Sequence, residues 1–501
     1  MRLFFMNSGQ ARTRLVQAGS VLAAVVMVAG CGSQYRPVVT PINPSGPAAQ
    51  PSSYAVTVSA PSPTTAGIAT IIDYAGDTVM ATAPIGPGPT TFTMDETGST
   101  GYTVNSDGTL SNFPITNNLQ AKMVNYSTLS TTAKPVQLFS PSVGLWVADQ
   151  DGNVADVLNG TPEAFKLALP VAPTPVAIIG PGIFGQSNFA ISLNNSSTPT
   201  GSIVPYSDMT CNTAPSTATQ NGEADALETA SYTVAARIPL GKCPVYSLPS
   251  SDQKRLFVLN RGSDTVTVIN SQNNTLDACT PFLNQAGQTV ICHPSLPLST
   301  TAGLAQDANK DVPAVAGPVY AEYNSATSQL VVADYDGGTI SVIDVSLDQY
   351  GNDSATFGTT FTIPVGKNPA AVTVLNDGSR AYTANQADGT VTIVNLSSHT
   401  VERTLAVVGH PRTVVSTQNS SYGKVYVAAP DSPYLTVIRT DQDIVDTTVL
   451  VEGNIVDVRV STQNGTSGNN NNVSRMPGAG QPCYLPGAAA AATLATCQTL
   501  P

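Results

Sequence analysis

Residues 363–407 read IPVGKNPAAVTVLNDGSRAYTANQADGTVTIVNLSSHTVERTLAV, and this stretch decides the fold class. It holds four short runs of β-branched and aromatic residues, separated by turn residues at 376–378, 388–389 and 397–399. Polarity alternates within each run, as in TVTIVN at 390–395, which is the period-2 pattern of a β-strand. The Asp388-Gly389 pair between two runs indicates a hairpin, because glycine adopts a positive φ without steric cost. The stretch therefore predicts a four-stranded antiparallel meander, which cannot bury both of its faces alone.

The same unit recurs along the chain. Its third run has eight copies, namely GIATIID (67–73), GTLSNF (108–113), GNVADV (152–157), GSIVPY (201–206), DTVTVIN (264–270), GTISVID (338–344), GTVTIVN (389–395) and PYLTVIR (433–439). The first run usually begins at a proline, a residue tolerated at the start of a strand: Pro89, Pro135, Pro175, Pro244, Pro318, Pro369 and Pro411. Repeated meanders of this kind predict an all-β fold in which the copies stack on one another.

The repeats resemble those of the YVTN-family β-propellers, which are named after a second-strand tetrapeptide. The best matches are YTAN at 382–385 and YVAA at 426–429, together with PVGKNP at 364–369 and the third run at 389–395. The resemblance spans about residues 54–460 and is strongest over 238–451. It implies a β-propeller of four-stranded blades and says little about activity.

Both ends of the array point to ring closure. Residues 452–460 look like a first strand with nothing of its own kind after it, whereas 54–58, 67–73 and 77–85 look like second to fourth strands without a first. Pairing the C-terminal strand with the three N-terminal strands completes one blade and removes the exposed edges of an open array. We therefore expect eight blades, with seven as the alternative if the terminal strands only decorate the ring.

Two intervals between copies are long enough to hold insertions, at 207–231 and 271–316. Neither carries a clear period, so both are expected to be loops over one end of the disc, where function tends to lie on a rigid scaffold. The tail at 461–501 begins with an Asn/Gly/Ser run and is expected to be largely disordered.

The first 53 residues predict export and a lipid anchor. Residues 1–30 have a basic stretch followed by a short apolar run, as in a signal peptide, and Val28-Ala29-Gly30-Cys31 resembles a bacterial lipobox. By that resemblance Cys31 is the acylated N-terminus. Gly32 in place of Asp favours the outer membrane in a cell with two membranes. Residues 31–53 are rich in Pro, Ser and Gly and are expected to form a semi-rigid tether.

The composition agrees with an exported all-β chain and argues against one class of partner. Only 11% of the 501 residues are charged, and the net charge is −12, which becomes −15 once the leader with its three arginines is removed. Such a surface repels nucleic acid, so nucleic-acid binding is not expected.

Six further cysteines point to disulfides in an exported chain, namely Cys211, Cys243, Cys279, Cys292, Cys483 and Cys497. Six cysteines allow fifteen connectivities. Closeness in sequence favours 279–292, 483–497 and 211–243. A zinc site near His293 is the competing interpretation, but the spacing lacks a C-x₂-C pair.

The first strands of a propeller line its central channel, so the charged residues there are the candidate ligand-binding groups: Asp95, Glu322, Arg412, Asp457 and Arg459. They could bind a sugar or lactone, or form a structural ring of ion pairs. No nucleophile–base pair or metal triad can be assembled from them. A calcium loop at 307–311 is a weaker alternative, because its sixth and twelfth positions lack the glycine and glutamate of an EF-hand. We therefore predict no catalytic residues, no metal and no cofactor.

These observations favour a non-enzymatic, lipid-anchored propeller of the cell envelope that serves as a binding platform for another protein or a polysaccharide. The alternative is a lactonase- or hydrolase-like enzyme that works from the central channel. An electron-transfer role ranks last, because the sequence has no C-x-x-C-H haem site. The sequence does not name the ligand or the membrane face.

Overall fold

The protein is described from a computed structural model. The structure describes residues 53–461, apart from 63, 131, 142–143, 161, 182–185, 195–218, 299–315 and 418. All of these belong to one unit, Pro51–Pro501. The predicted leader, Cys31, almost all of the tether, the tail after residue 461 and the candidate calcium loop at 307–311 lie outside the described residues.

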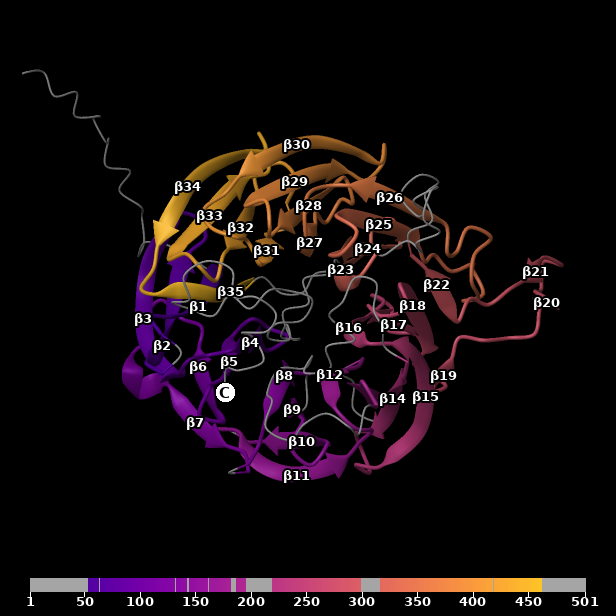
Figure 1. Cartoon of the computed structure of the whole chain (residues 1–501), viewed down its shortest axis with the longest axis horizontal. Coiled ribbons are helices and arrows are strands. Elements are labelled where there is room, and N and C mark those ends of the chain that lie inside the picture. Colours follow the sequence, from indigo (N-terminus) through magenta and orange to yellow (C-terminus); the bar gives the residue numbers. More distant parts are fainter. Residues whose placement is uncertain are drawn as a thin grey trace, which may run out of the picture. The chain divides into compact units, whose positions relative to one another are not determined.

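The described chain is an all-β ring of eight antiparallel blades, each with four strand positions (Figure 1). In every blade the first strand lies nearest the centre of the ring and the fourth lies at the rim. From the centre outward, blade 1 consists of β35 (Asn454–Val460), β1 (Tyr54–Ala60), β2 (Ala66–Asp73) and β3 (Thr78–Pro87). Blade 2 consists of β4 (Thr91–Met94), β5 (Thr100–Val104), β6 (Thr109–Pro114) and β7 (Asn125–Thr128). Blade 3 consists of β8 (Pro135–Phe139), β9 (Leu145–Asp149), β10 (Val154–Asn159) and β11 (Ala164–Pro170). Blade 4 consists of β12 (Pro175–Ile179), β13 (Ser187–Ser192), β14 (Asn221–Glu228) and β15 (Val234–Lys242).

The second half of the ring repeats this order. Blade 5 consists of β16 (Pro244–Pro249), β17 (Arg255–Asn260) and β18 (Thr265–Asn270), with β19 (Thr275–Leu276) and β22 (Ser295–Pro297) at its rim. Blade 6 consists of β23 (Pro318–Asn324), β24 (Gln329–Asp334), β25 (Thr339–Asp344) and β26 (Thr360–Pro364). Blade 7 consists of β27 (Pro369–Val374), β28 (Arg380–Asn385), β29 (Thr390–Asn395) and β30 (Thr400–Ala406). Blade 8 consists of β31 (Thr413–Ser416), β32 (Lys424–Ala428), β33 (Tyr434–Arg439) and β34 (Ile444–Leu450).

Local sequence explains where many of these strands begin and turn. Five first strands (β8, β12, β16, β23 and β27) begin at the predicted proline, while β4 and β31 begin two residues after theirs. The predicted hairpin glycine, Gly389, has φ +63°. An added Cβ there would lie 3.2 Å from the carbonyl oxygen of Gly409, so this turn favours glycine both for its φ and for the space it leaves.

Blade 1 is built from both ends of the described chain. β35 pairs antiparallel with β1, with Val458 opposite Thr57 and Val460 opposite Ala55. The hydroxyl of Ser59 also donates to the carbonyl oxygen of Glu452 at 2.6 Å. The prediction of eight blades closed by one split blade is confirmed, and the seven-blade alternative is wrong.

The core lies between the blades. One cluster of buried apolar side chains extends from Val136 in blade 3 to Ile438 in blade 8, and two further clusters lie on either side of blade 1. The inner strands are consequently buried on both faces, as the burial of Val391–Val394 illustrates. Each blade therefore depends on its neighbours for burial of its apolar surface.

Blade 4 departs from the prediction. Its third strand is β14, which pairs with β13 on one side and β15 on the other, whereas residues 201–206 lie outside the described residues. The prediction that 201–206 form the third strand of this blade is therefore wrong, because β14 occupies that position. The predicted insertion at 207–231 includes β14 and so is not wholly a loop. The sequence of β14, NGEADALE, is rich in residues of low β-propensity, but burial between two strands overrides that preference.

Blade 5 has a divided fourth strand. β19 pairs with one end of β18 and β22 pairs with the other end. The two segments meet at Val268, whose carbonyl oxygen accepts the N–H of Asp277 and whose N–H donates to the carbonyl oxygen of Pro294. The intervening residues 278–293 leave the blade and carry the short hairpin of β20 (Phe282–Leu283) and β21 (Thr289–Val290). We call residues 278–293 the rim projection. Figure 1 shows its hairpin beyond the rim, so this part of the predicted 271–316 insertion does not lie over one end of the disc.

Helix is nearly absent from the described residues, where η1 (Ala121–Met123) is a single 3₁₀ turn. A helix with the length and apolar character needed for a membrane crossing does not occur in that part of the chain.

Candidate functional site

The predicted channel residues lie in different settings. Asp95 follows the last residue of β4 and caps the next turn, where its carboxylate accepts the backbone N–H groups of Ser99 at 2.6 Å and Thr100 at 3.1 Å. Arg412 directly precedes β31 and is half-buried. Both residues therefore lie just outside a first strand, at its end in blade 2 and at its beginning in blade 8.

Glu322 joins two blades. It is buried in β23, and its carboxylate accepts the backbone N–H of Val374, in β27 of the next blade, at 2.9 Å. Gln137 in β8 does the same for blades 3 and 4, since its side-chain oxygen accepts the N–H of Ile178 at 2.8 Å. These contacts give Glu322 a structural role in holding adjacent first strands together.

Asp457 and Arg459 are the two predicted residues that the structure brings into direct contact. Both lie in β35, and Nη2 of Arg459 is 3.1 Å from Oδ2 of Asp457. Arg459 is only 1% exposed. Asp457 also accepts the N–H of Val458 at 2.8 Å, so its carboxylate is held on both sides.

Arg459 also interacts with an aromatic pair that the sequence did not single out. Tyr246 in β16 and Tyr320 in β23 are buried with their ring centroids 4.7 Å apart, and their strands lie across the centre of the ring from β35 (Figure 1). Burial by itself lowers the pKa of Arg459, but Asp457, Tyr320 and Tyr246 outweigh it and keep that pKa above its ordinary value. The guanidinium therefore remains charged inside a polar cluster.

A second contact between blades explains the tyrosine that begins the second-strand tetrapeptides at 382–385 and 426–429. Tyr382 and Arg380 in β28 both donate to the carboxylate of Asp443, in the turn between β33 and β34 of the next blade. Burial and the Asp443 carboxylate strongly raise the pKa of the Tyr382 phenol. Asp77 has the same role between blades 8 and 1, where its carboxylate accepts from Nζ of Lys424 at 2.5 Å and from the hydroxyl of Tyr426 at 3.2 Å.

We expect Asp443→Ala to lower the free energy of unfolding by about 1–3 kcal/mol, because it leaves a partly buried guanidinium and a phenol without their shared acceptor. Chemical denaturation of the full chain measures the change. Asp441→Ala is the matched control, since Asp441 pairs with Arg439 at the surface two residues away. Equal effects of the two substitutions would contradict the assigned role of Asp443.

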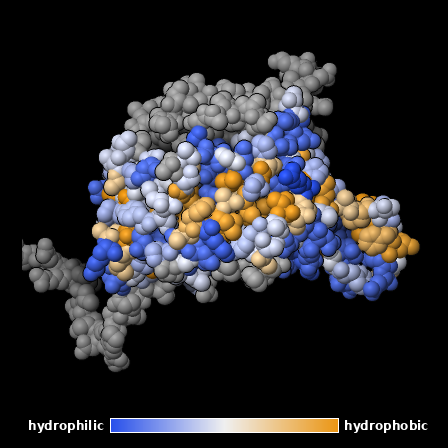
Figure 2. Space-filling view, turned by 90° about the horizontal axis from the view of Figure 1, so that it is seen from below, coloured by the Kyte–Doolittle hydropathy of each residue, from blue (hydrophilic) through white to orange (hydrophobic). Residues whose placement is uncertain are grey.

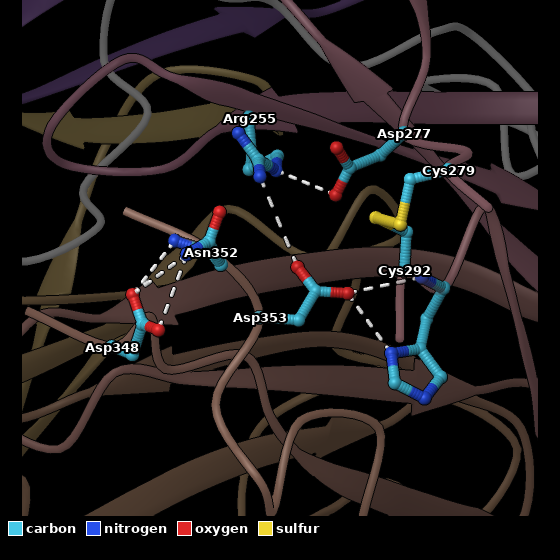
Figure 3. The surroundings of a disulfide bond; sticks show 8 residues. Arg255, Asp277, Cys279, Cys292, Asp348, Asn352 and Asp353 are labelled. Atoms are coloured by element: carbon cyan, nitrogen blue, oxygen red, sulfur yellow. Dashed lines mark hydrogen bonds and ion pairs between the residues drawn. A yellow bond between two sulfur atoms is a disulfide. The ribbon is translucent and has the colours of Figure 1, made fainter. Parts of the chain in front are cut away.

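A buried ionic network anchors the rim projection (Figure 3). Arg255 in β17 contacts two aspartates. Its Nε lies 2.7 Å from Oδ2 of Asp277, and the Nη2 atom of the same guanidinium lies 3.8 Å from Oδ1 of Asp353. Asp353 also accepts the backbone N–H of His293 at 3.0 Å and contacts its Nδ1 at 2.9 Å. Because Asp353 belongs to the long β25–β26 connection of blade 6, the network ties the base of the projection to two blades.

A disulfide closes the base of the projection. The pairing of Cys279 with Cys292 is confirmed, with 5.5 Å between their Cα atoms, so the zinc interpretation is wrong for these two cysteines. Cys243 is also disulfide-bonded. Its predicted partner Cys211, like Cys483 and Cys497, lies outside the described residues. No group of three potential metal ligands occurs within the described ranges.

The outer part of the projection exposes three large apolar side chains among uncharged polar residues such as Gln285 and Gln288. Leu283 is 68% exposed, Ile291 is 55% exposed and Phe282 is 42% exposed. Figure 2 shows hydrophobic surface on this protrusion, at the right of the view. Residues 278–292 contain no Asp, Glu, Lys or Arg. A disulfide and an ionic network thus hold exposed apolar side chains away from the ring.

Comparison with known proteins gives information on the fold. No protein family model matches the chain, and no curated protein matches it. Apo AztD from Citrobacter koseri is 11% identical, with a TM-score of 0.52 over 83% of this chain and 99% of that chain. A crystal structure of Citrobacter koseri AztD is also 11% identical, with a TM-score of 0.52 over 81% of this chain and 97% of that chain. A candidate 6-phosphogluconolactonase from Bacteroides fragilis is 14% identical and covers 83% of this chain and 99% of its own, with a TM-score of 0.48. At such identities the likeness to AztD shows the fold alone: the chain is a β-propeller protein of eight blades.

Proposed function

We propose that the protein is a binding platform of the cell envelope and that the rim projection is its binding element. The observation that carries this proposal is the exposed apolar surface of Phe282, Leu283 and Ile291 on a segment fixed by a disulfide and a buried ionic network. Contiguous apolar surface that a protein holds in solvent is typical of an interaction site. Rigid presentation also reduces the entropy lost on binding.

The chemistry of the projection favours a protein over a polysaccharide as the partner. Leu283 and Ile291 offer no hydrogen bond to a sugar hydroxyl, whereas they can fill an apolar groove. The lack of charged residues at 278–292 contrasts with a chain of net charge −12. The partner surface is therefore expected to be apolar and to need no opposite charge.

The predicted lipid anchor completes this proposal. Acylation of Cys31 would place the propeller at the outer membrane of a cell with two membranes, with residues 31–53 as a spacer. Several acyl chains anchor a protein stably, since each buried CH₂ contributes about 0.8 kcal/mol. Mass spectrometry of the purified mature chain tests this part separately, because an unmodified Cys31 would remove the anchor and leave the binding element untouched.

The decisive experiment is affinity capture from solubilised envelope with the full chain as bait. We expect the double variant Leu283→Gln/Ile291→Gln to retain at least about fivefold less of a specific partner than the wild type, because truncating apolar contacts at an interface costs 1 kcal/mol or more. The matched control is Tyr422→Ser, which removes another exposed apolar side chain, 74% exposed, from a turn in blade 8. Equal retention by all three baits would exclude the projection as the binding element.

A second variant removes the whole segment without disturbing the blade. Asp277 and Pro294 both bond Val268, so a short glycine link between them should preserve the divided fourth strand. The far-ultraviolet circular dichroism and unfolding midpoint of this variant should stay close to those of the wild type, while partner retention is lost. Retention by the shortened chain would likewise contradict the proposal.

The alternative enzyme in the channel has weaker support. The carboxylates of Glu322 and Asp457 are already engaged with the N–H groups of Val374 and Val458. A channel hydrolase would require one of them to be released for chemistry. Turnover of sugar lactones that is abolished by Glu322→Gln, with the fold retained, would favour the enzyme over the platform.

A further inference from the structure

A polar lock recurs between the second and third strands of the blades. In blade 7 the Asn385 side chain donates to the hydroxyl of Thr392 at 2.8 Å, and in blade 5 that of Asn260 donates to Thr267 at 2.8 Å. Blade 6 has an aspartate instead, and Asp334 accepts from the hydroxyl of Ser341 at 2.7 Å. Each lock joins an amide or carboxylate at the end of the second strand to a third-strand hydroxyl.

Blade 3 has a different pair at these two positions. Asp149 ends β9 as Asp334 ends β24, and Asp156 lies opposite Val147 as Ser341 lies opposite Val332. Two carboxyl groups therefore meet where the other blades have at least one neutral partner. Asp149 and Asp156 are each only 2% exposed, so solvent does not separate their charges.

The contacts of Asp149 decide which carboxyl group must carry a proton. Its Oδ1 accepts the backbone N–H of Lys134 at 2.6 Å and that of Asp151 at 2.9 Å, so Asp149 is placed as an acceptor. A hydrogen bond between two carboxyl groups needs one proton, and Asp156 is the member that can donate it. Burial, followed by the charge of Asp149, raises the pKa of Asp156 to about 7.

We propose that Asp149 and Asp156 form a proton-dependent lock on blade 3, closed when they share a proton and open when both are ionised. Each of the two carboxyl groups acts electrostatically on the other. The charge of the neighbouring Asp151 also disfavours ionisation of Asp149. Opening would loosen the β9–β10 hairpin, which contacts the Lys134 amide through Asp149 and blade 4 through Gln150, whose side chain donates to the carbonyl oxygen of Pro175 at 3.2 Å. The lock is independent of the proposed binding function.

The sign of the pH dependence follows from linkage. A carboxyl group with a raised pKa in the folded protein binds its proton more tightly there than in the unfolded chain. Its contribution to stability is thus full below pH 4 and is lost as the pH rises toward 7. Blade 3 should accordingly become less protected as the pH passes through neutrality, whereas blade 7, with Asn385 and Thr392 at these positions, should not.

Amide hydrogen exchange of the full chain between pH 5.5 and 8.5, corrected for intrinsic rates, tests the lock. We expect protection of residues 145–159 to fall about tenfold across this range relative to residues 380–395 of blade 7. Asp156→Thr, which installs the hydroxyl of the other blades, should remove this relative fall. Should that variant fail to fold, Asp149→Asn/Asp156→Thr reproduces the pair of blade 7 and serves the same purpose. The proposal is overturned if the wild type shows no relative fall, or if the substituted chain shows the same fall.

Discussion

A chain that ends after Gly453 is expected to lose the cooperative unfolding transition of the full chain. This deletion removes β35, which supplies the first strand of blade 1 and pairs with β1 along Ala55–Ala60. It also removes Ile455, Val458 and Val460 from the apolar cluster between blades 8 and 1. The edge of β1 and two blade faces would then meet solvent, which is a larger loss than any single substitution can cause.

The measurement is thermal unfolding followed by circular dichroism, with limited proteolysis of residues 54–87 as a second readout. A chain that ends after Ser461 is the control, because it is shortened but keeps every hydrogen bond between β1 and β35. We expect this control to unfold in one transition near that of the full chain. If the chain that ends after Gly453 also unfolded in one transition near that of the full chain, the pairing of β35 with β1 would not be needed to close the ring.

The second large effect concerns the buried pair in β35. Arg459→Met should lower the free energy of unfolding by about 3–5 kcal/mol, because it leaves the carboxylate of Asp457 buried without its cation. Arg459→Met combined with Asp457→Leu should recover much of that loss, since replacing both ions by apolar side chains removes the unpaired charge. Chemical denaturation of the two variants and the wild type measures both changes.

This comparison also separates a structural from a ligand-binding role of the pair. If Asp457 and Arg459 only stabilise the centre of the ring, the double variant should retain partner binding in the capture experiment. A double variant that is as stable as the wild type but has lost its ligand would assign the pair to a binding site. A stable single variant would show that the contact with Asp457 contributes little.

Much of the fold could be predicted because short stretches of sequence specify the strands and turns of each repeat. Alternation within runs such as 390–395, and turn residues such as Gly389, act over a few residues, so they identify strands and hairpins directly. The missing first strand at one end and the surplus strand at the other predicted the split blade. The prediction failed at β14, where Ala and acidic residues occupy a strand that only its neighbours stabilise.

The sites were harder to predict, because their partners come from different blades. Tyr382 and Asp443 are 61 positions apart, and Arg255 in β17 of blade 5 pairs with Asp353 in the β25–β26 connection of blade 6. Tyr246 and Tyr320 follow prolines in two first strands, and that shared position was the signal that could have paired them. For the channel, charge type identified Asp457 and Arg459, but the contact between Glu322 and the Val374 N–H depends on how two blades pack and is not visible in the sequence.

The split blade has a consequence for the order of events in the cell. β35 ends at Val460, so no closed ring can exist until almost the whole described chain has been synthesised. During translation the N-terminal strands wait with an unpaired edge, and the nascent polypeptide cannot complete its tertiary structure early. The last strand to emerge is also the one that finishes assembly.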